Sequence, residues 1–459
     1  MKDESRGRIL AVTLQLVPSG FRPSSFILHP SSFILSAMVL FSHPIGNRNA
    51  HQAALALHEA GWLAELWTSF HWTPGGPAER FLPRGLVRLL GRRTFPAAVR
   101  GRVRTDPWRE IGRMLAPRLP GGGWLGRHEI GPCSVDAVFR AMDRRVARRV
   151  RTLARRPRAG ESLRAVYAYE DGAAATFREA RRQGLRCFYD LPIGYWRAGQ
   201  AIFDEEAERE PAWAATLTGR SDSPAKLARK DEELLGADAV FVASTFTRQT
   251  LGSAPGLRAS VHVVPYGAPA VGPEPPAAGR APGPLRVLFV GSLGQRKGLS
   301  YLLEAVRRLG GRHVELTLLG QKTVAGCRAL DDATRAHRWI PTLPHGEVLA
   351  EMARQDVLVF PSLFEGFGLV ILEAMSRGLP VIATAHTAGP DVIEDGADGF
   401  LVPIRSADAI VEPLETLLSR PDLLVHLKHA ARRKAAALDW ETHRRRLADA
   451  LLQELERPR

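Results

Sequence analysis

The sequence predicts an α/β protein in which two doubly wound, Rossmann-like domains face each other across a cleft. A chain of 459 residues is longer than a single hydrophobic core usually holds. Short apolar runs alternate with stretches of helical periodicity, which is typical of parallel sheets covered by helices on both faces. A segment rich in proline and glycine, 266–284, interrupts this alternation, and we interpret it as the linker between the domains.

The first domain is expected to occupy residues 38–265. Its predicted strands are short apolar runs bounded by turn residues, at 39–42, 63–68, 165–169, 186–190, 237–243 and 261–265. Its clearest predicted helices show apolar residues at helical spacing, at 49–61, 176–183 and 245–251. Residues 1–37 contain the near-repeat SSFILHP–SSFILSA and prolines that exclude a helix, so we interpret them as an unfolded extension or a mis-assigned start before Met38.

The second domain is expected to occupy residues 285–435, where the alternation of strand and helix restarts. Its predicted strands lie at 285–290, 314–319, 357–360 and 380–383, and its predicted helices at 299–309, 348–354 and 369–376. In open α/β sheets a ligand binds at the carboxyl ends of the strands. The cleft between two such domains is therefore the expected site.

The composition indicates an anionic partner. The net charge of +15, almost all from arginine, suits a nucleotide, an acidic substrate, a phospholipid surface or nucleic acid, although a genome-wide arginine bias would give the same composition. The predicted helix 140–158 has arginines on its outer face, which either meet only solvent or contact an anionic membrane surface. No aromatic residues are interleaved with this basic run, which argues against nucleic acid.

Cysteine usage and hydropathy indicate the compartment. The three cysteines are scattered and lack metal-ligand spacing, which favours a reducing environment and no structural zinc. No run of 18 apolar residues predicts a transmembrane helix. The protein is therefore expected in the cytoplasm, either free or peripheral on the inner face of the membrane.

The stretch FVGSLGQRKGL (289–299) carries a pattern suited to phosphate groups. A predicted strand ends, a turn at Gly291 follows, and Arg296 and Lys297 precede a predicted helix. The glycine allows the backbone to approach a ligand closely, while a helix N-terminus and two cations favour a diphosphate. The alternative is an ordinary strand-to-helix turn whose cations are solvated.

The stretch SLFEGFGLVILEAMSRGLP (362–380) places Glu365 and Glu373 in a run that otherwise resembles core. Burying an unpaired carboxylate costs several kcal/mol, so both side chains either reach solvent or face a ligand. Backbone N–H groups at the start of the predicted helix can face a phosphate or a sugar hydroxyl. A ligand that is part sugar and part diphosphate explains why acids and bases would line one cleft.

Three stretches together resemble the donor-binding domain of glycosyltransferase family 4, the group 1 glycosyl transferases, which has the GT-B fold. They are FVGSLGQRKG, PSLFEGFGLVILEAMSRGLPVIAT and GPDVIEDGADGFLVP, and Glu365 and Glu373 have the spacing of that family's E-x7-E pair. The resemblance covers most of the chain from Val39 on and is weakest between 70 and 160. It implies retaining, metal-independent transfer of a hexose from a UDP-, GDP- or ADP-sugar to a glycan or glycolipid acceptor in polysaccharide biosynthesis, with no cofactor.

The resemblance also implies roles for individual residues. Lys297 and Arg296 would hold the donor diphosphate. Glu373 would bind the ribose hydroxyls of the nucleotide, and Glu365 would face the transferred sugar. The positions that would complete the donor site are Gly291, Ser292, Gly46, Phe367, Gly368, Leu369, Trp339 and Ile340. The final helix, within 436–459, would pack back on the first domain.

The chain departs from the family pattern in two places. Many members carry arginine where this chain has Ser292, and we expect Arg296 to compensate. The acceptor-side histidine of the first domain is not visible. The candidates for a general base or a hydroxyl-binding group are acids at predicted strand ends, Glu170, Asp171 and Asp190, the second of which also fits an Asp-Gly turn. Further cleft candidates, each with a structural alternative, are Tyr195, Trp196, Arg197, His43 and His386.

Two other functions stay open at this point. A sugar-nucleotide epimerase of the same fold would convert the donor without an acceptor. A homologue without catalysis would only bind the nucleotide sugar; Ser292 favours this slightly, whereas the intact Glu365 and Lys297 argue against it. A dinucleotide oxidoreductase is excluded because no G-x-G-x-x-G opens either predicted sheet.

Overall fold

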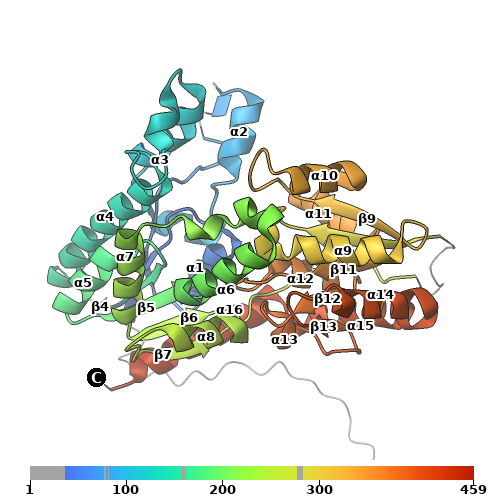
Figure 1. Cartoon of the computed structure of the whole chain (residues 1–459). Helices are drawn as coiled ribbons and strands as arrows, with labels where there is room; N and C mark the ends of the chain where they lie inside the picture. Colours follow the sequence, from blue (N-terminus) through green and yellow to red (C-terminus); the bar gives the residue numbers. More distant parts are fainter. Residues whose placement is uncertain (1–36, 77–78, 81, 157–161, 277–282, 459) are drawn as a thin grey trace, which may run out of the picture.

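The computed structural model describes residues 37–76, 79–80, 82–156, 162–276 and 283–458. Apart from Ala37, the predicted N-terminal extension lies outside these residues. The described chain forms two α/β domains that lie side by side, the first coloured blue to green and the second yellow to red in Figure 1. The predicted fold class is confirmed.

The first domain contains a seven-stranded sheet in which all neighbouring strands are parallel. Its strands are β1 (Ala37–Ser42), β2 (Leu63–Thr68), β3 (Val103–Thr105), β4 (Ser162–Tyr169), β5 (Arg186–Leu191), β6 (Ala239–Val242) and β7 (Ser260–Val263). The strand order β3-β2-β1-β4-β5-β6-β7 changes direction between β1 and β4. Such a switch point opens a crevice at the carboxyl ends of the strands, where ligands bind.

Four helices of this domain begin where a short polar side chain accepts a backbone hydrogen bond. Asn47, Ser134, Ser223 and Ser244 cap these four by accepting from the N–H three residues further on. The helices of the domain are α1 (Arg48–Glu59), α2 (Arg84–Gly91), α3 (Trp108–Leu115), α4 (Val135–Arg155), α5 (Ala174–Arg182), α6 (Trp196–Arg209), α7 (Pro224–Leu235) and α8 (Thr245–Thr250).

Helix α4 corresponds to the predicted basic helix at 140–158, but it starts five residues earlier and ends at Arg155. It buries an apolar stripe made of Val138, Met142, Val146 and Val150 and leaves most of its arginines exposed. No helix in the described chain, α4 included, is both long and apolar enough to cross a bilayer.

The second domain contains a six-stranded parallel sheet with the order β10-β9-β8-β11-β12-β13. Its strands are β8 (Leu285–Val290), β9 (Val314–Leu319), β10 (Arg338–Ile340), β11 (Val357–Phe360), β12 (Val381–Thr384) and β13 (Gly399–Val402). Its helices are α9 (Leu299–Leu309), α10 (Arg328–Ala336), α11 (His345–Met352), α12 (Leu369–Met375), α13 (Gly389–Val392), α14 (Asp408–Ser419) and α15 (Pro421–Ala437). The switch point lies between β8 and β11, the strands that precede the two quoted motifs.

The last helix, α16 (Trp440–Glu456), lies against the first domain (Figure 1). Leu447 and Leu451 are buried in the same core cluster as residues of β1 and α1. Arg444 donates hydrogen bonds to Gln52 and Glu59 of α1, both at 2.8 Å. The chain thus runs from the first domain to the second and returns.

The predicted linker is packed at its start. Tyr266 and Ala268 are buried in a core cluster of the second domain, and the Ala268 N–H donates to the Leu438 carbonyl at 2.6 Å. The proline and glycine content of this segment predicted a connection between the domains. The apolar residues Tyr266 and Ala268 within it nevertheless pack in the core. Residues 277–282 of the linker lie outside the described chain.

Candidate active site

The turn after β8 is tight because a second glycine lies against it. The Gly291 N–H donates to the Leu319 carbonyl at 2.9 Å, and Gly291 has φ of 148°, a value that L side chains rarely adopt. A Cβ atom added at Gly320 would overlap the Gly291 carbonyl oxygen. The ends of β8 and β9 can therefore come this close only because both positions, 291 and 320, are glycine. Ser292, the neighbour of Gly291, is exposed.

Three charged side chains converge at the carboxyl ends of β8 and β11. The Lys297 ammonium group contacts the Glu365 carboxylate, and Arg296 Nη1 lies 3.2 Å from the same carboxylate oxygen. Arg296 also donates to the Phe364 carbonyl at 2.8 Å. Arg296 and Lys297 thus form one cluster with Glu365, although they precede it by 69 and 68 positions in the sequence.

Burial makes this cluster receptive to an anion. Lys297 is only 8% exposed, and its ammonium nitrogen lies 4.6 Å from the centre of the Phe360 ring. Burial, and after it the Arg296 guanidinium, lowers the pKa of Lys297 well below its usual range. Two cations share a single carboxylate here, so a negatively charged ligand would stabilise both.

The segment that begins α12 is held in place by backbone contacts. The Glu365 N–H donates to the His386 carbonyl at 3.1 Å, and the Ala388 N–H donates to the Phe367 carbonyl at 2.8 Å. Gly368 caps the helix, and Leu369 is its first residue. Phe367 is buried beneath this turn. The structure thus fixes the backbone of the predicted sugar-binding turn.

Glu373 lies where the two domains meet. His345 Nε2 of α11 lies 2.8 Å from its carboxylate, and Arg48 Nη1 from the first residue of α1 lies at 3.7 Å. Its side chain is 15% exposed. The second carboxylate of the pair is therefore contacted from both domains.

Trp339 and Ile340 lie on the edge strand β10. The Trp339 indole N–H donates to the Gly320 carbonyl at 2.9 Å, and the Lys322 ammonium lies 4.8 Å from its ring centre. The Ile340 carbonyl accepts from the Gly320 N–H at 2.9 Å. Both residues are half-buried and next to the glycine turn.

Gly46 lies in the loop between β1 and α1 of the first domain. It has φ of 67°, and an added Cβ would lie 2.5 Å from the Phe95 ring, so no other residue fits. Its N–H donates to His43 Nδ1 at 2.8 Å, and the Ile45 N–H donates to the same nitrogen. Burial, reinforced by His51, lowers the pKa of His43 to about 3. The neutral imidazole therefore holds this turn, which favours the structural interpretation of His43.

An interdomain contact next to Glu365 was not foreseen from the sequence. The Phe364 side chain is buried in a cluster with Phe203, Leu217 and Phe246 of the first domain. The Gly366 carbonyl accepts from Thr247 Oγ1 at 2.9 Å and from the Ser244 hydroxyl. His386 stacks on Phe246, with ring centres 4.6 Å apart.

A sequence signal for this contact existed in the glycines of PIGYWRAG (192–199). A Cβ at Gly194 would lie 2.5 Å from the Phe364 ring, and one at Gly199 would lie 3.0 Å from it. Two glycines five positions apart thus mark the side of the first domain that receives the ring.

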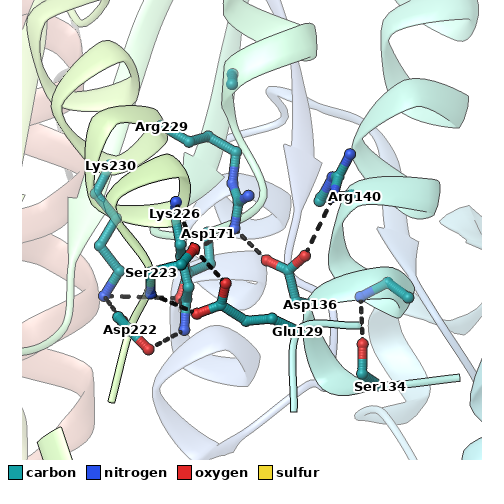
Figure 2. A network of polar contacts seen from close by, with 12 residues as sticks. Glu129, Ser134, Asp136, Arg140, Asp171, Asp222, Ser223, Lys226, Arg229 and Lys230 are labelled. Carbon is teal, nitrogen blue, oxygen red and sulfur yellow. Dashed lines mark hydrogen bonds and ion pairs between the residues drawn. The ribbon is translucent and has the colours of Figure 1, made fainter. Parts of the chain in front are cut away.

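The acidic candidates of the first domain form a separate network with basic residues of α7. Glu170 pairs with Lys230 at 3.4 Å, and burial raises the pKa of Glu170 to about 7. Asp171, which has φ of 68°, lies 3.6 Å from Arg229 and 3.9 Å from Lys226. Figure 2 shows Asp171 beside these side chains. Within the described chain, no hydrogen bond or ion pair joins this network to Glu365, Lys297 or Arg296.

Asp190 and the aromatic candidates are used inside the first domain. Asp190 is buried and accepts from the Tyr167 hydroxyl at 2.6 Å, and burial raises the pKa of Asp190 to about 7. Tyr195, Trp196 and Arg197 all donate to the carboxylate of Asp231. These three cleft candidates are therefore organised around an acid of α7.

A family model described as "Glycosyl transferases group 1" matches residues 274–434. Residues 274–434, which hold both donor motifs, are therefore similar to the group 1 glycosyl transferases. Glycogen synthase of Mycobacterium tuberculosis (strain H37Rv) is 30% identical over 270 residues, which are 56% of this chain and 62% of that protein. The alignment thus spans about three fifths of the length of that relative.

Two solved structures share the architecture of nearly the whole chain. Sucrose-phosphate synthase from Thermosynechococcus elongatus superposes with a TM-score of 0.62 at 17% identity, covering 91% of this chain and 98% of that one. Anabaena Alr3699/HepE in complex with UDP-glucose superposes with a TM-score of 0.55 at 16% identity, covering 91% and 99%. At these identities the likeness shows the shared two-domain GT-B fold alone.

Proposed function

We propose that this chain is a retaining, metal-independent glycosyltransferase that moves a hexose from a nucleotide-diphosphate sugar to a glycan or glycolipid acceptor. The observation that carries the proposal is the Lys297–Glu365–Arg296 cluster, with Glu373 eight residues further on at the interdomain cleft. These residues lie in the part of the chain that matches the group 1 glycosyltransferases.

Each donor-side residue has a role that follows from its contacts. Lys297 and Arg296 would bind the diphosphate and stabilise it as the leaving group, a task that a metal ion performs in other transferases. Glu365 would exchange part of its ion pairing for hydroxyl groups of the sugar. Glu373, which lies beside Arg48 of the first domain, would accept hydrogen bonds from the ribose hydroxyls.

The donor is proposed to be a UDP-, GDP- or ADP-sugar. A structural neighbour was solved with UDP-glucose, which makes that nucleotide sugar the first one to test. Trp339 and Ile340, beside the glycine turn, would line the nucleobase pocket. The backbone around Gly46 and Phe367 would approach the donor from the two sides of the cleft.

On the acceptor side, we propose Glu170 as the group that receives or orients the acceptor hydroxyl. Its pKa of about 7 would let it exchange a proton near neutral pH. Asp171 would hold the cations that surround it. We propose a cytoplasmic location, as the scattered cysteines of the sequence suggest.

The proposal is tested on the full chain by calorimetric titration with UDP, GDP, ADP and CMP, and by nucleotide release from UDP-glucose in the presence of glycan acceptors. Lys297→Met keeps the buried stem over Phe360 and removes the charge. We expect it to lower turnover by about 100-fold, as loss of a charge-stabilising group commonly does. Glu373→Ala should weaken nucleotide binding by about 10-fold because it removes a charged hydrogen-bond acceptor.

The matched control is Arg307→Ala, which removes an exposed cation of the same domain that pairs only with Glu304. It should leave binding and turnover unchanged. Wild-type rates in Lys297→Met would remove the diphosphate assignment. Nucleotide binding without any turnover would favour the non-catalytic homologue, and donor isomerisation without an acceptor would favour the epimerase.

A further inference from the structure

Exposed apolar side chains gather on one short segment of the first domain. Of the seven large hydrophobic side chains that are exposed in the described chain, six lie between residues 108 and 135. They are Trp108, Leu115, Leu119, Trp124, Ile130 and Val135. We call residues 108–135 the protrusion. Trp108 is 78% exposed and Trp124 is 64% exposed, which are unusual values for the largest aromatic side chain.

The protrusion is a built structure and not a loosely packed loop. Glu110 is buried and pairs with Arg93 at 2.9 Å and with Arg113 at 2.7 Å. A Cβ added at Gly112 would lie 2.5 Å from Cys133 Sγ, so the backbone of α3 packs closely on the following segment. The Cys133 N–H also donates to the Leu125 carbonyl at 2.8 Å. The apolar side chains thus face outward from a fixed frame.

The surroundings of these side chains are strongly basic. From the start of α2 to the start of α4 (84–135) the sequence has eleven arginines and three acidic residues, a net charge of +8 out of +15 for the chain. Arg109, Arg118 and Arg127 are exposed, and none of them pairs with a carboxylate in the described chain. Their charges are therefore available to an external anion.

The position of the protrusion suits contact with a flat surface. Figure 1 shows α2 and α3 standing at one end of the molecule, beyond the sheet of the first domain, with α10 of the second domain at the same end. A large planar partner could reach the tryptophans without displacing the core of either domain.

We propose that the protrusion binds an anionic phospholipid surface, with Trp108 and Trp124 at the depth of the headgroups and the arginines around them pairing with phosphates. Tryptophan suits this depth because its ring is apolar and its N–H can stay hydrated. Each cation held near an anionic bilayer strengthens binding, and apolar area entering the interface adds to it. A second copy of this chain is disfavoured as the occupant because two surfaces of +8 repel each other.

This proposal moves the membrane contact away from α4, the basic helix singled out in the sequence. The apolar stripe of α4 is buried, so beyond Val135 at its start α4 offers lipid headgroups charge but no large exposed apolar side chain. The protrusion offers both. The proposal does not depend on the proposed reaction, because vesicle binding is measured without donor or acceptor.

The experiment is flotation of the full chain with vesicles of phosphatidylcholine alone and with vesicles that also contain phosphatidylglycerol. We expect flotation with the anionic vesicles only, weakening as salt is raised. The Trp108→Ser/Trp124→Ser variant should bind at least about 10-fold more weakly, since both rings would otherwise enter the interface. Its melting temperature should stay that of the wild type, because both side chains are exposed in the folded chain.

The matched control is Leu235→Ser, which removes the remaining exposed apolar side chain, at the end of α7. It should float like the wild type. Equal flotation of the double tryptophan variant and the wild type would overturn the proposal, as would absence of wild-type binding. Sedimentation velocity tests whether a second copy of the chain binds the protrusion. A wild-type dimer that dissociates in the tryptophan variant would assign the protrusion to self-association instead.

Discussion

At the residue scale, the two domains differ in how burial affects their titratable groups. In the second domain, burial disfavours the charge on Lys297, and Glu365 compensates by direct contact. In the first domain, burial keeps His43 neutral and raises the pKa of Glu170 to about 7. The charge on Lys297 therefore depends on its contact with Glu365, whereas Glu170 changes protonation near neutral pH.

His43 gives a prediction about stability and pH. Its pKa is about 3 in the folded chain and near 6.5 when unfolded, so the neutral form stabilises the fold above pH 6.5 and this stabilisation is lost as the pH falls toward 3. His43→Asn keeps an acceptor for the Gly46 N–H but does not titrate. Between pH 8 and pH 5 the wild type should lose about 2 kcal/mol more unfolding free energy than the variant.

Urea denaturation at the two pH values measures this difference. His51, whose pKa is lowered to about 4, titrates in both proteins, so the comparison isolates His43. Equal losses in the two proteins would show that the His43 imidazole is protonated in the folded chain.

At the element scale, α16 decides whether the first domain has a complete core. Leu447 and Leu451 fill the same cluster as Leu57 of α1 and Val39 of β1. The helix comes after the whole second domain in the sequence, so the first domain lacks part of its core until the chain is complete. Capping by Asp439, which accepts from the Thr442 N–H at 2.8 Å, fixes where this helix starts.

Truncating Leu451 should destabilise the first domain. Leu451 is fully buried, and Leu→Ala in a core costs about 2–5 kcal/mol through lost burial and the cavity left behind. We expect Leu451→Ala to lower the melting temperature by several degrees, measured by scanning calorimetry. Gln453→Ala, an exposed change on the same helix, should leave it unaltered. Identical melting curves for both variants would mean that α16 does not support the first domain in solution.

At the scale of the whole molecule, the two domains are joined by contacts around the candidate donor site. Phe364 inserts into the first domain directly before Glu365, and Asp391 accepts from the Thr245 N–H at 2.9 Å. Arg405 of the second domain pairs with Glu206 of α6 at 2.7 Å. Movement of one domain relative to the other would therefore shift the backbone next to the candidate sugar-binding carboxylate.

Phe364→Ala should loosen this arrangement. Removing the ring would leave a cavity between the domains, and a Phe→Ala change in a packed site lowers the unfolding free energy by about 3–5 kcal/mol. We expect a larger radius of gyration by small-angle scattering without donor, because the interdomain contact weakens. Phe400→Ala, which truncates a half-buried ring of β13 packed against the core of the second domain, should lower stability without opening the molecule. An unchanged radius in Phe364→Ala would show that the polar contacts alone hold the domains together.

Much of the fold and of the donor site could be predicted because the signals are local. Runs such as LRVLFV and VELTLL become β8 and β9 with the predicted bounds, since a buried parallel strand needs only a short apolar segment. No element was predicted between residues 70 and 139, where the helices α2 and α3 are short and arginine-rich. The buried Glu110 pairs with Arg93, 17 positions away, and no spacing in the sequence announces that contact.

The sequence by itself determined the alternation of elements, the two-domain α/β class and the residues of the donor motifs, because each depends on neighbours within about ten positions. Only the tertiary structure decided what these residues touch. It brought Lys297 onto Glu365, placed Arg48 of the first domain beside Glu373, and tied Asp171 to α7 rather than to the donor motifs. The physical reason is that burial and ion pairing depend on packing between distant segments. A single sequence lists the charged and apolar residues but does not say which of them are in contact.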